Sequence, residues 1–176
     1  MKYENPIIPY DDMPQYAKVV LAPVEKAYKK VLYINWGIVY TILILIAALL
    51  FIFIKKMQIN WLMAVVALLL ISLITFTIAA IEIGFKNKAW ALREKDIIFK
   101  KGWLFQSTHI IPFIKVQHCV MHSGPISRRY GLASIKLMTA ASQNIDISIN
   151  GLKQETAEQL KVFIMEKIEG YEPTTN

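Results

Sequence analysis

The chain has 176 residues, of which 55% are hydrophobic and 19% charged, and its formal net charge is +7 at pH 7. With that much charge, the apolar residues must be segregated along the chain rather than spread evenly. The single cysteine, Cys119, excludes an intrachain disulfide.

Residues 1–22 form the first segment. They carry Pro6, Pro9 and Pro14 among tyrosines and acidic residues, a composition that favours extended chain without a fold of its own. Pro23 suits the first turn of a helix, and apolar residues then recur at helical spacing. We therefore expect an interfacial helix that starts at Pro23 and leads into a membrane span.

Two uncharged stretches follow, at residues 33–54 and 61–81. Each is long enough to span about 30 Å, the thickness of a hydrocarbon core. Neither carries the polar stripe of a buried helix in a soluble protein. The first stretch is also too long, and begins too far along the chain, for a signal peptide. Residues 23–85 are thus predicted to hold the interfacial helix and a transmembrane hairpin.

Residues 55–60 are too few to connect the two spans in any way other than as an antiparallel hairpin, and they contain two lysines. Positive charge is concentrated at the opposite ends of the spans, which predicts that both termini are cytoplasmic. This distribution favours the anionic inner leaflet of the cell membrane over nucleic acid as the partner. The basic residues expected at the membrane surface are Lys26, Lys29, Lys30, Lys86, Lys88 and Arg93.

Residues 86–170 are predicted to be a soluble domain, followed by a tail at 171–176. Short apolar stretches separated by turn residues predict six strands, at 88–94, 96–101, 103–112, 116–123, 132–140 and 144–150. In the last of these, Ile145, Ile147 and Ile149 alternate with polar residues, as in a half-buried strand. Residues 154–169 then show helical periodicity, which predicts a helix that covers the sheet.

His118, Cys119 and His122 are the residue types that bind metals or form nucleophilic sites. In a strand, however, the two histidines lie about 13 Å apart on one face and Cys119 points to the other. No glycine loop typical of phosphate binding is present in the sequence. We therefore expect no metal, no cofactor and no catalytic residue.

Arg128 and Arg129 are the most concentrated polar feature of this domain. An arginine pair in a loop can hold a carboxylate or phosphate in a bidentate contact. It can equally bind loop carbonyl groups and organise the turn before Gly131. We prefer the turn-organising interpretation and keep the ligand-binding one open.

Two segments, IPFIKVQH at 111–118 and GPISRRYGLASIKLMTA at 124–140, resemble the paired signatures of the bacterial pleckstrin-homology-like (PH-like) domain of small two-span membrane proteins. The resemblance implies an α+β membrane protein, with a transmembrane hairpin followed by a bent antiparallel sheet or partly open barrel and a C-terminal capping helix. That fold has about seven strands, so we expect the stretch at 103–112 to split in two.

This fold serves lipid, peptide and protein binding alike, so it does not fix the function. Our preferred expectation is a non-enzymatic scaffold at the inner leaflet that works with other membrane proteins carrying PH-like domains. One alternative is a sensor of anionic lipid headgroups that uses Arg128 and Arg129. Another is an accessory subunit of a transporter or of an envelope-stress system.

Overall fold

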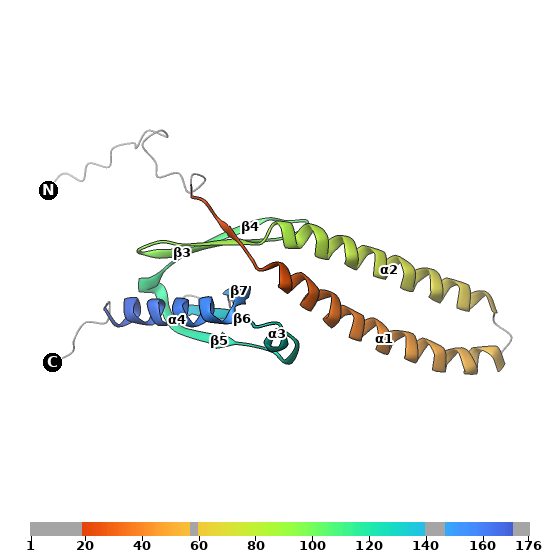
Figure 1. Ribbon diagram of the computed structural model, residues 1–176. Helices are drawn as coiled ribbons and strands as arrows, with labels where there is room; N and C mark the ends of the chain where they lie inside the picture. The colour runs from red at the N-terminus through yellow and green to blue at the C-terminus, as the bar shows by residue number, and fades with distance from the viewer. Residues whose placement is uncertain (1–18, 57–59, 140–146, 171–176) are drawn as a thin grey trace, which may run out of the picture.

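The computed structural model describes residues 19–56, 60–139 and 147–170. A long helical hairpin extends from one end of a small domain built of two sheets and a covering helix (Figure 1). Most of the predicted N-terminal segment, the centre of the hairpin loop and the C-terminal tail lie outside the described residues.

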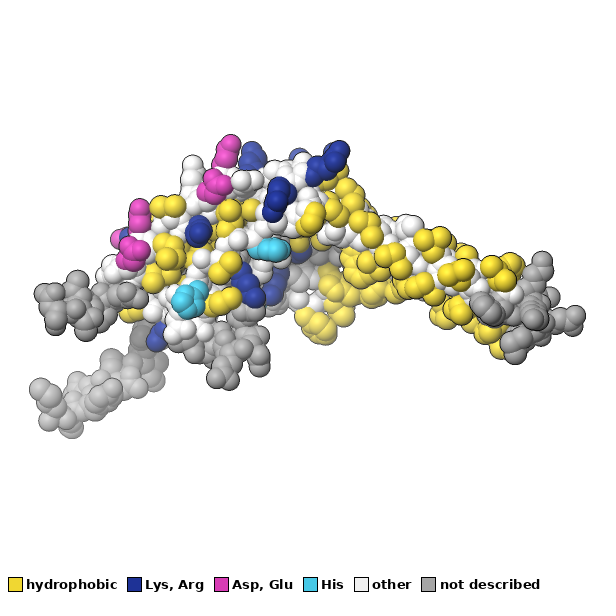
Figure 2. Space-filling view, turned by 90° about the horizontal axis from the view of Figure 1, so that it is seen from below, with side chains coloured by type: hydrophobic (Ala, Val, Ile, Leu, Met, Phe, Trp, Pro, Cys, Tyr) yellow, Lys and Arg dark blue, Asp and Glu magenta, His cyan; other side chains and the backbone are white. Residues whose placement is uncertain are grey.

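The hairpin consists of α1 (Lys26–Lys56) and α2 (Asn60–Lys86), and both helices extend beyond the uncharged stretches. Their apolar side chains face outward: Leu45 is 61% exposed and Leu68 is 68% exposed. A helix in the core of a soluble protein would bury such residues. Figure 2 shows hydrophobic side chains along the hairpin and charged ones over the domain. The two helices are long and apolar enough to cross a membrane.

Polar contacts join α1 to α2 at two levels. The Tyr40 hydroxyl donates to the carbonyl oxygen of Leu73 at 3.2 Å and also hydrogen-bonds the Thr77 hydroxyl. Nearer the domain, Lys29 Nζ and the Tyr33 hydroxyl donate to the carboxylate of Glu82, at 2.7 Å and 2.6 Å. Such contacts between helices fix how two spans pack, because lipid offers polar groups no alternative partner.

The domain contains two antiparallel sheets. The first has the order β1 (Ala22–Pro23), β2 (Ala89–Leu92), β3 (Asp96–Lys101) and β4 (Ser107–Pro112). The second has the order β5 (Val116–His122), β6 (Leu132–Thr139) and β7 (Ile147–Lys153). A 3-10 turn, η3 (Phe113–Lys115), leads from β4 to β5, and a short helix, α3 (Pro125–Arg129), leads from β5 to β6. The chain then forms α4 (Gln154–Glu169).

Each of the six predicted stretches overlaps a strand, but the expected origin of the seventh strand was wrong. The stretch at 103–112 does not split, because Gly102, with φ of +127°, starts a loop and strand β4 begins only at Ser107. The additional strand is β1, which precedes the hairpin and pairs with β2. Pro23 therefore lies in a strand rather than in the first turn of a helix, and α1 begins at Lys26. The two sheets do not close into a barrel.

The core lies between the two sheets and α4. Phe113, Ile135, Leu137, Ile149 and Ile164 are each fully buried there. Burial of one such side chain is worth about 1.5–3 kcal/mol. The predicted half-buried strand is confirmed within the described residues, since Ile147 and Ile149 are buried and Ser148 is only partly so.

The first turns of α1 and the residues just before it pack on the domain, and their position along the membrane interface stays a prediction. Val24 and Val31 are buried, and the amide of Glu25 donates to the carbonyl oxygen of Gly151 at 2.9 Å. Gly151 has φ of +80°, and a Cβ there would lie 2.5 Å from Cγ of Tyr28. Only glycine fits this backbone and this approach, so hairpin and domain are packed together closely.

Candidate functional site: a pocket between hairpin and domain

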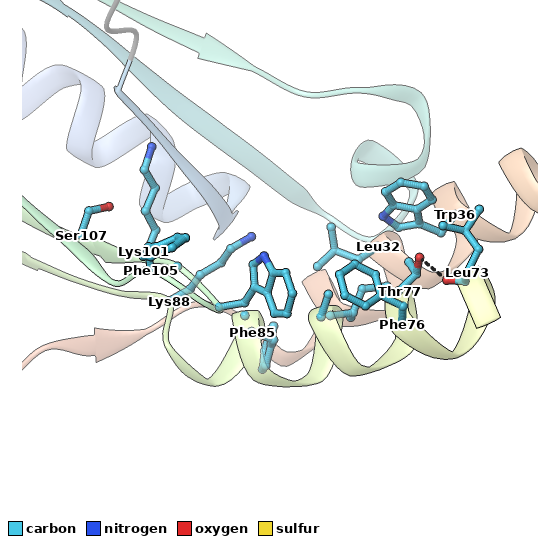
Figure 3. A pocket seen from close by; sticks show the side chains of 15 residues that line it. Leu32, Trp36, Leu73, Phe76, Thr77, Phe85, Lys88, Lys101, Phe105 and Ser107 are labelled. Carbon is cyan, nitrogen blue, oxygen red and sulfur yellow. Dashed lines mark hydrogen bonds between the residues drawn. The ribbon is translucent and has the colours of Figure 1, made fainter. Parts of the chain in front are cut away.

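A pocket of about 550 Å³ lies where the domain-side ends of α1 and α2 meet the loop between β3 and β4. We call it the junction pocket. Its helical end is apolar and its sheet end is basic, and Figure 3 shows Trp36, Leu73 and Phe76 at one end with Lys88 and Lys101 at the other. The residues that define the two ends are Leu32, Trp36, Leu73, Phe76, Lys88 and Lys101.

The register of the β2–β3 hairpin places the two lysines. Ala89 pairs with Lys100, and the same register continued by one position sets Lys88 opposite Lys101. Like charges directly opposite each other on paired strands are destabilising. Lys88 Nζ also lies 4.9 Å from the ring centroid of Tyr28, so part of its charge meets an aromatic face.

The two lysines have no acidic partner within the described part of the chain, where neither forms an ion pair. Burial, and then the nearby charge of Lys101, lower the pKa of Lys88 below its ordinary value. A half-buried ammonium group without a counter-ion is unfavourable. An anion in the pocket would remove this cost.

His109 adds a further unsatisfied group next to the lysines. It pairs with Phe99 across β3 and β4, and its Nε2 atom is buried without a hydrogen-bond partner among the described residues. Burial, followed by the charge of Lys101, lowers the pKa of His109, which keeps the imidazole neutral at pH 7. Buried polar atoms usually have a hydrogen-bond partner. Among the described residues, the His109 Nε2 atom next to Lys101 has none.

The basic residues predicted at the membrane surface divide into three groups. Lys26, Lys30 and Lys86 are exposed at the domain end of the hairpin. Lys29 is paired with Glu82, and Lys88 lines the junction pocket. Arg93 lies at the β2–β3 turn, at the other end of β2 from the hairpin, and donates through Nε to Asp96 at 2.6 Å, which raises the pKa of Arg93.

Arg128 and Arg129 are exposed on α3 and do not line the junction pocket. Arg128 Nη2 lies 3.5 Å from the carbonyl oxygen of Ser123, a long and exposed contact. The helix itself begins with Pro125 in its first turn and contacts the domain-side part of α1. The choice between the turn-organising and ligand-binding interpretations therefore stays a prediction.

The three residues considered for metal or nucleophilic chemistry do not come together. Cys119 is buried against the core, whereas His118 and His122 are exposed. Burial also raises the pKa of the Cys119 thiol, which disfavours the nucleophilic thiolate. Among the described residues, no group of histidine, cysteine and acidic side chains is placed to hold a metal ion.

Lys101, His109 and Tyr28 were missed as site residues from sequence. Lys101 could have been found from the sequence. A tight turn at 93–95 sets the register of the two flanking strands, and that register brings Lys101 opposite Lys88. His109 and Tyr28 required the register of β4 and the packing of α1, and neither can be obtained from local pattern.

The model of the bacterial PH domain family matches residues 20–168, from just before β1 to the end of α4. The chain belongs to the bacterial PH domain family. The match includes the hairpin, which lies between the first two strands of the domain. The predicted fold class is thereby confirmed, with sheets that remain open, and the chain is a membrane protein with two transmembrane helices and a bacterial PH domain.

A curated relative is the UPF0699 transmembrane protein YdbS of Bacillus subtilis (strain 168), which is 32% identical over 78 residues. The alignment spans 43% of this chain and 47% of that relative. No solved structure matches the chain significantly. These similarities fix the family of the chain and leave its ligand to be argued from the site.

Proposed function

We propose that this bacterial PH domain protein binds an anionic membrane lipid in the junction pocket, at the leaflet on the side of its domain. The observation that carries the proposal is the pair Lys88 and Lys101, which lacks a described counter-ion at one end of a pocket whose other end is apolar. The proposal favours the lipid-headgroup alternative over the scaffold, but with different residues from Arg128 and Arg129.

The chemistry of the pocket matches an anionic amphiphile. A lipid phosphate accepts hydrogen bonds from both ammonium groups, and charge-assisted bonds of this kind are about twice as strong as neutral ones. Trp36, Leu73 and Phe76 then contact the upper part of the acyl chains. A free phosphate ion gains only the first of these contacts, so the whole pocket fits a lipid better than an ion.

The test is lipid-dependent thermal stability of the full chain in detergent micelles. Ligand that binds only the folded state raises the unfolding temperature. We expect phosphatidylglycerol to raise it more than phosphatidylcholine, and inorganic phosphate to have little effect. The double variant Lys88→Gln/Lys101→Gln should lose the difference between the two lipids.

The matched control is Lys26→Gln/Lys30→Gln, which removes the same charge from exposed positions at the same end of the hairpin and outside the pocket. This variant should keep the difference between the lipids. If the two double variants respond alike, attraction to the anionic surface in general explains the binding, and the pocket does not.

The orientation of the protein belongs to the same proposal. Basic residues at the domain end of the hairpin favour termini, domain and pocket on the cytoplasmic side of the cell membrane. A reporter enzyme that is active only outside the cytoplasm should be silent when fused after Asn176. Activity of that fusion would overturn the orientation.

A scaffold function is the second candidate, and one observation favours it. Among the described strands, β5 pairs only with β6, and a shallow groove lies between β5 and α4. An extended segment of another membrane protein with a PH-like domain can add to such an edge.

The groove can be tested at Val162, which is 57% exposed on α4 and lines it. Val162→Glu should release a co-purifying partner and leave the lipid response unchanged, whereas unchanged co-purification would count against the groove.

A further inference from the structure

Three consecutive large apolar side chains occupy the loop between β3 and β4. Trp103 is 39% exposed, Leu104 64% and Phe105 85%. A loop tip in water normally carries small or polar residues, and a contiguous exposed apolar patch marks a contact with a membrane or a partner. The position of the loop decides between these two.

The loop lies against the domain-side part of α2. The indole of Trp103 meets the ring of Phe76 edge to face, with 5.1 Å between the centroids. Its Cβ lies 3.3 Å from the position that a Cβ on Gly84 would occupy. Because Gly84 has no side chain, the loop can approach the helix closely.

This contact sets the depth of Trp103, the first residue of the apolar tip. Glu82 is the first charged residue after the uncharged stretch at 61–81, and Phe76 precedes it by six positions. Six residues of helix correspond to about 9 Å, so the Trp103 ring reaches a level where α2 carries no charge. Amphipathic aromatic rings such as that of tryptophan are favoured near the interface between headgroups and acyl chains.

The backbone of the loop is held in a fixed conformation. Gly102 has φ of +127°, and a Cβ at that position would lie 1.9 Å from the carbonyl oxygen of Phe105. The turn therefore requires glycine. Lys100 and Lys101 precede it in β3, and lysine next to an apolar tip suits the boundary between headgroups and acyl chains.

We propose that Trp103, Leu104 and Phe105 insert into the domain-side leaflet as a third contact of the protein with the bilayer, beside the two spanning helices. The occupant of this surface is the lipid bilayer itself. A third contact beside the two helices restricts the height and tilt of the domain over the membrane. Insertion does not depend on an anionic lipid in the junction pocket, although Trp103 and Phe105 also line that pocket.

The test places a fluorescent probe on the loop of the full chain in vesicles. In a Cys119→Ala background, Phe105→Cys is labelled with an environment-sensitive fluorophore and reconstituted into vesicles of phosphatidylcholine brominated in its acyl chains. The control is a label at Ile114→Cys, a position 63% exposed in η3, at the end of β4 away from the hairpin. We expect quenching at position 105 to exceed that at position 114 at least twofold.

Equal quenching at the two positions would overturn the insertion. A label at Leu104→Cys gives an independent second position in case the first variant unfolds, and it should behave like the label at 105. Quenching should persist in purely zwitterionic vesicles and in the Lys88→Gln/Lys101→Gln background. If the native chain shows no lipid-dependent stability while quenching is intact, that result counts against the pocket alone.

Discussion

The core of the domain and the junction pocket differ in whether their side chains have partners within the described part of the chain. The core between the sheets and α4 consists of apolar side chains such as Ile135, Leu137 and Ile149, which are fully buried. At the junction, Lys88 and Lys101 lack a described counter-ion, His109 Nε2 lacks a described hydrogen-bond partner, and large apolar residues are exposed. The core thus completes its own contacts, whereas the junction leaves charged and polar groups without a partner among the described residues. Locally unfavourable features of this kind are typical of functional sites.

The largest expected effect is in the core. Ile147 is 8% exposed and pairs with Leu137, so Ile147→Asp buries an unpaired carboxylate and should lower the free energy of unfolding by about 4 kcal/mol or more. Ser148→Asp, on the more open face, should cost about 1 kcal/mol or less. Chemical denaturation of the full chain in detergent measures both. Equal stability of the two variants would show that the faces of β7 are misassigned.

The full chain is needed for that measurement, because β1 and Tyr28 contribute to the domain from before the hairpin. A fragment that starts after α2 would lack both.

The next effect is at the contact between hairpin and domain. Gly151→Ala forces a side chain into a backbone with positive φ and against the Tyr28 ring, which should cost about 2 kcal/mol. Tyr28→Ala removes the clash but leaves the backbone strain. In a double-mutant cycle the two substitutions should therefore cost less together than the sum of their separate effects. Strict additivity would show that Tyr28 does not pack on Gly151.

A smaller effect, of opposite sign, is expected in the junction pocket. Lys88→Met removes a half-buried charge without a described counter-ion, so the variant should unfold at the same temperature as the native protein or at a higher one. The same variant should bind anionic lipid more weakly. A structural role of Lys88 predicts the reverse, with lower stability and unchanged binding.

The pH dependence gives a check on this prediction. Burial lowers the pKa of Lys88 below its ordinary value of 10.5, so the folded state binds this proton less tightly than the unfolded state does. The native protein should therefore gain stability as the pH rises through the lowered pKa toward 10.5. Lys88→Met should lack this part of the gain, and identical pH profiles would mean that the pKa is not lowered.

The smallest effect is expected at α3. Arg128 makes only a long, exposed contact with the carbonyl of Ser123, so Arg128→Gln/Arg129→Gln should change the free energy of unfolding by no more than about 0.5 kcal/mol. It should also leave the preference for anionic lipid in place. Loss of that preference in this variant would move the lipid site from the junction pocket to α3.

Sequence pattern was sufficient where the determinants are local. The strand at 96–101 and the helix at 154–169 were predicted with the bounds that β3 and α4 have. The short apolar run of the strand and the amphipathic spacing of the helix are each complete within the segment. Strand β1 has two residues and pairs with a segment on the far side of the hairpin. No local periodicity can reveal such a strand.

The site was less predictable than the fold for a related reason. Lys88 was identified as basic and close to the membrane, but its importance comes from Lys101, which faces it only through strand register. The pairing of Lys29 with Glu82 and the contact of Trp103 with Phe76 bring together segments that are separated in sequence. These contacts follow from the hairpin lying between the first two strands of the domain.

The most direct test of the lipid-binding proposal is native mass spectrometry of the full chain released from its own membrane in mild detergent. We predict one anionic phospholipid retained per chain by the native protein and by Arg128→Gln/Arg129→Gln. The Lys88→Gln/Lys101→Gln variant should retain none. Equal retention of anionic lipid by that variant, or its loss from the Arg128→Gln/Arg129→Gln protein alone, would contradict a lipid site in the junction pocket.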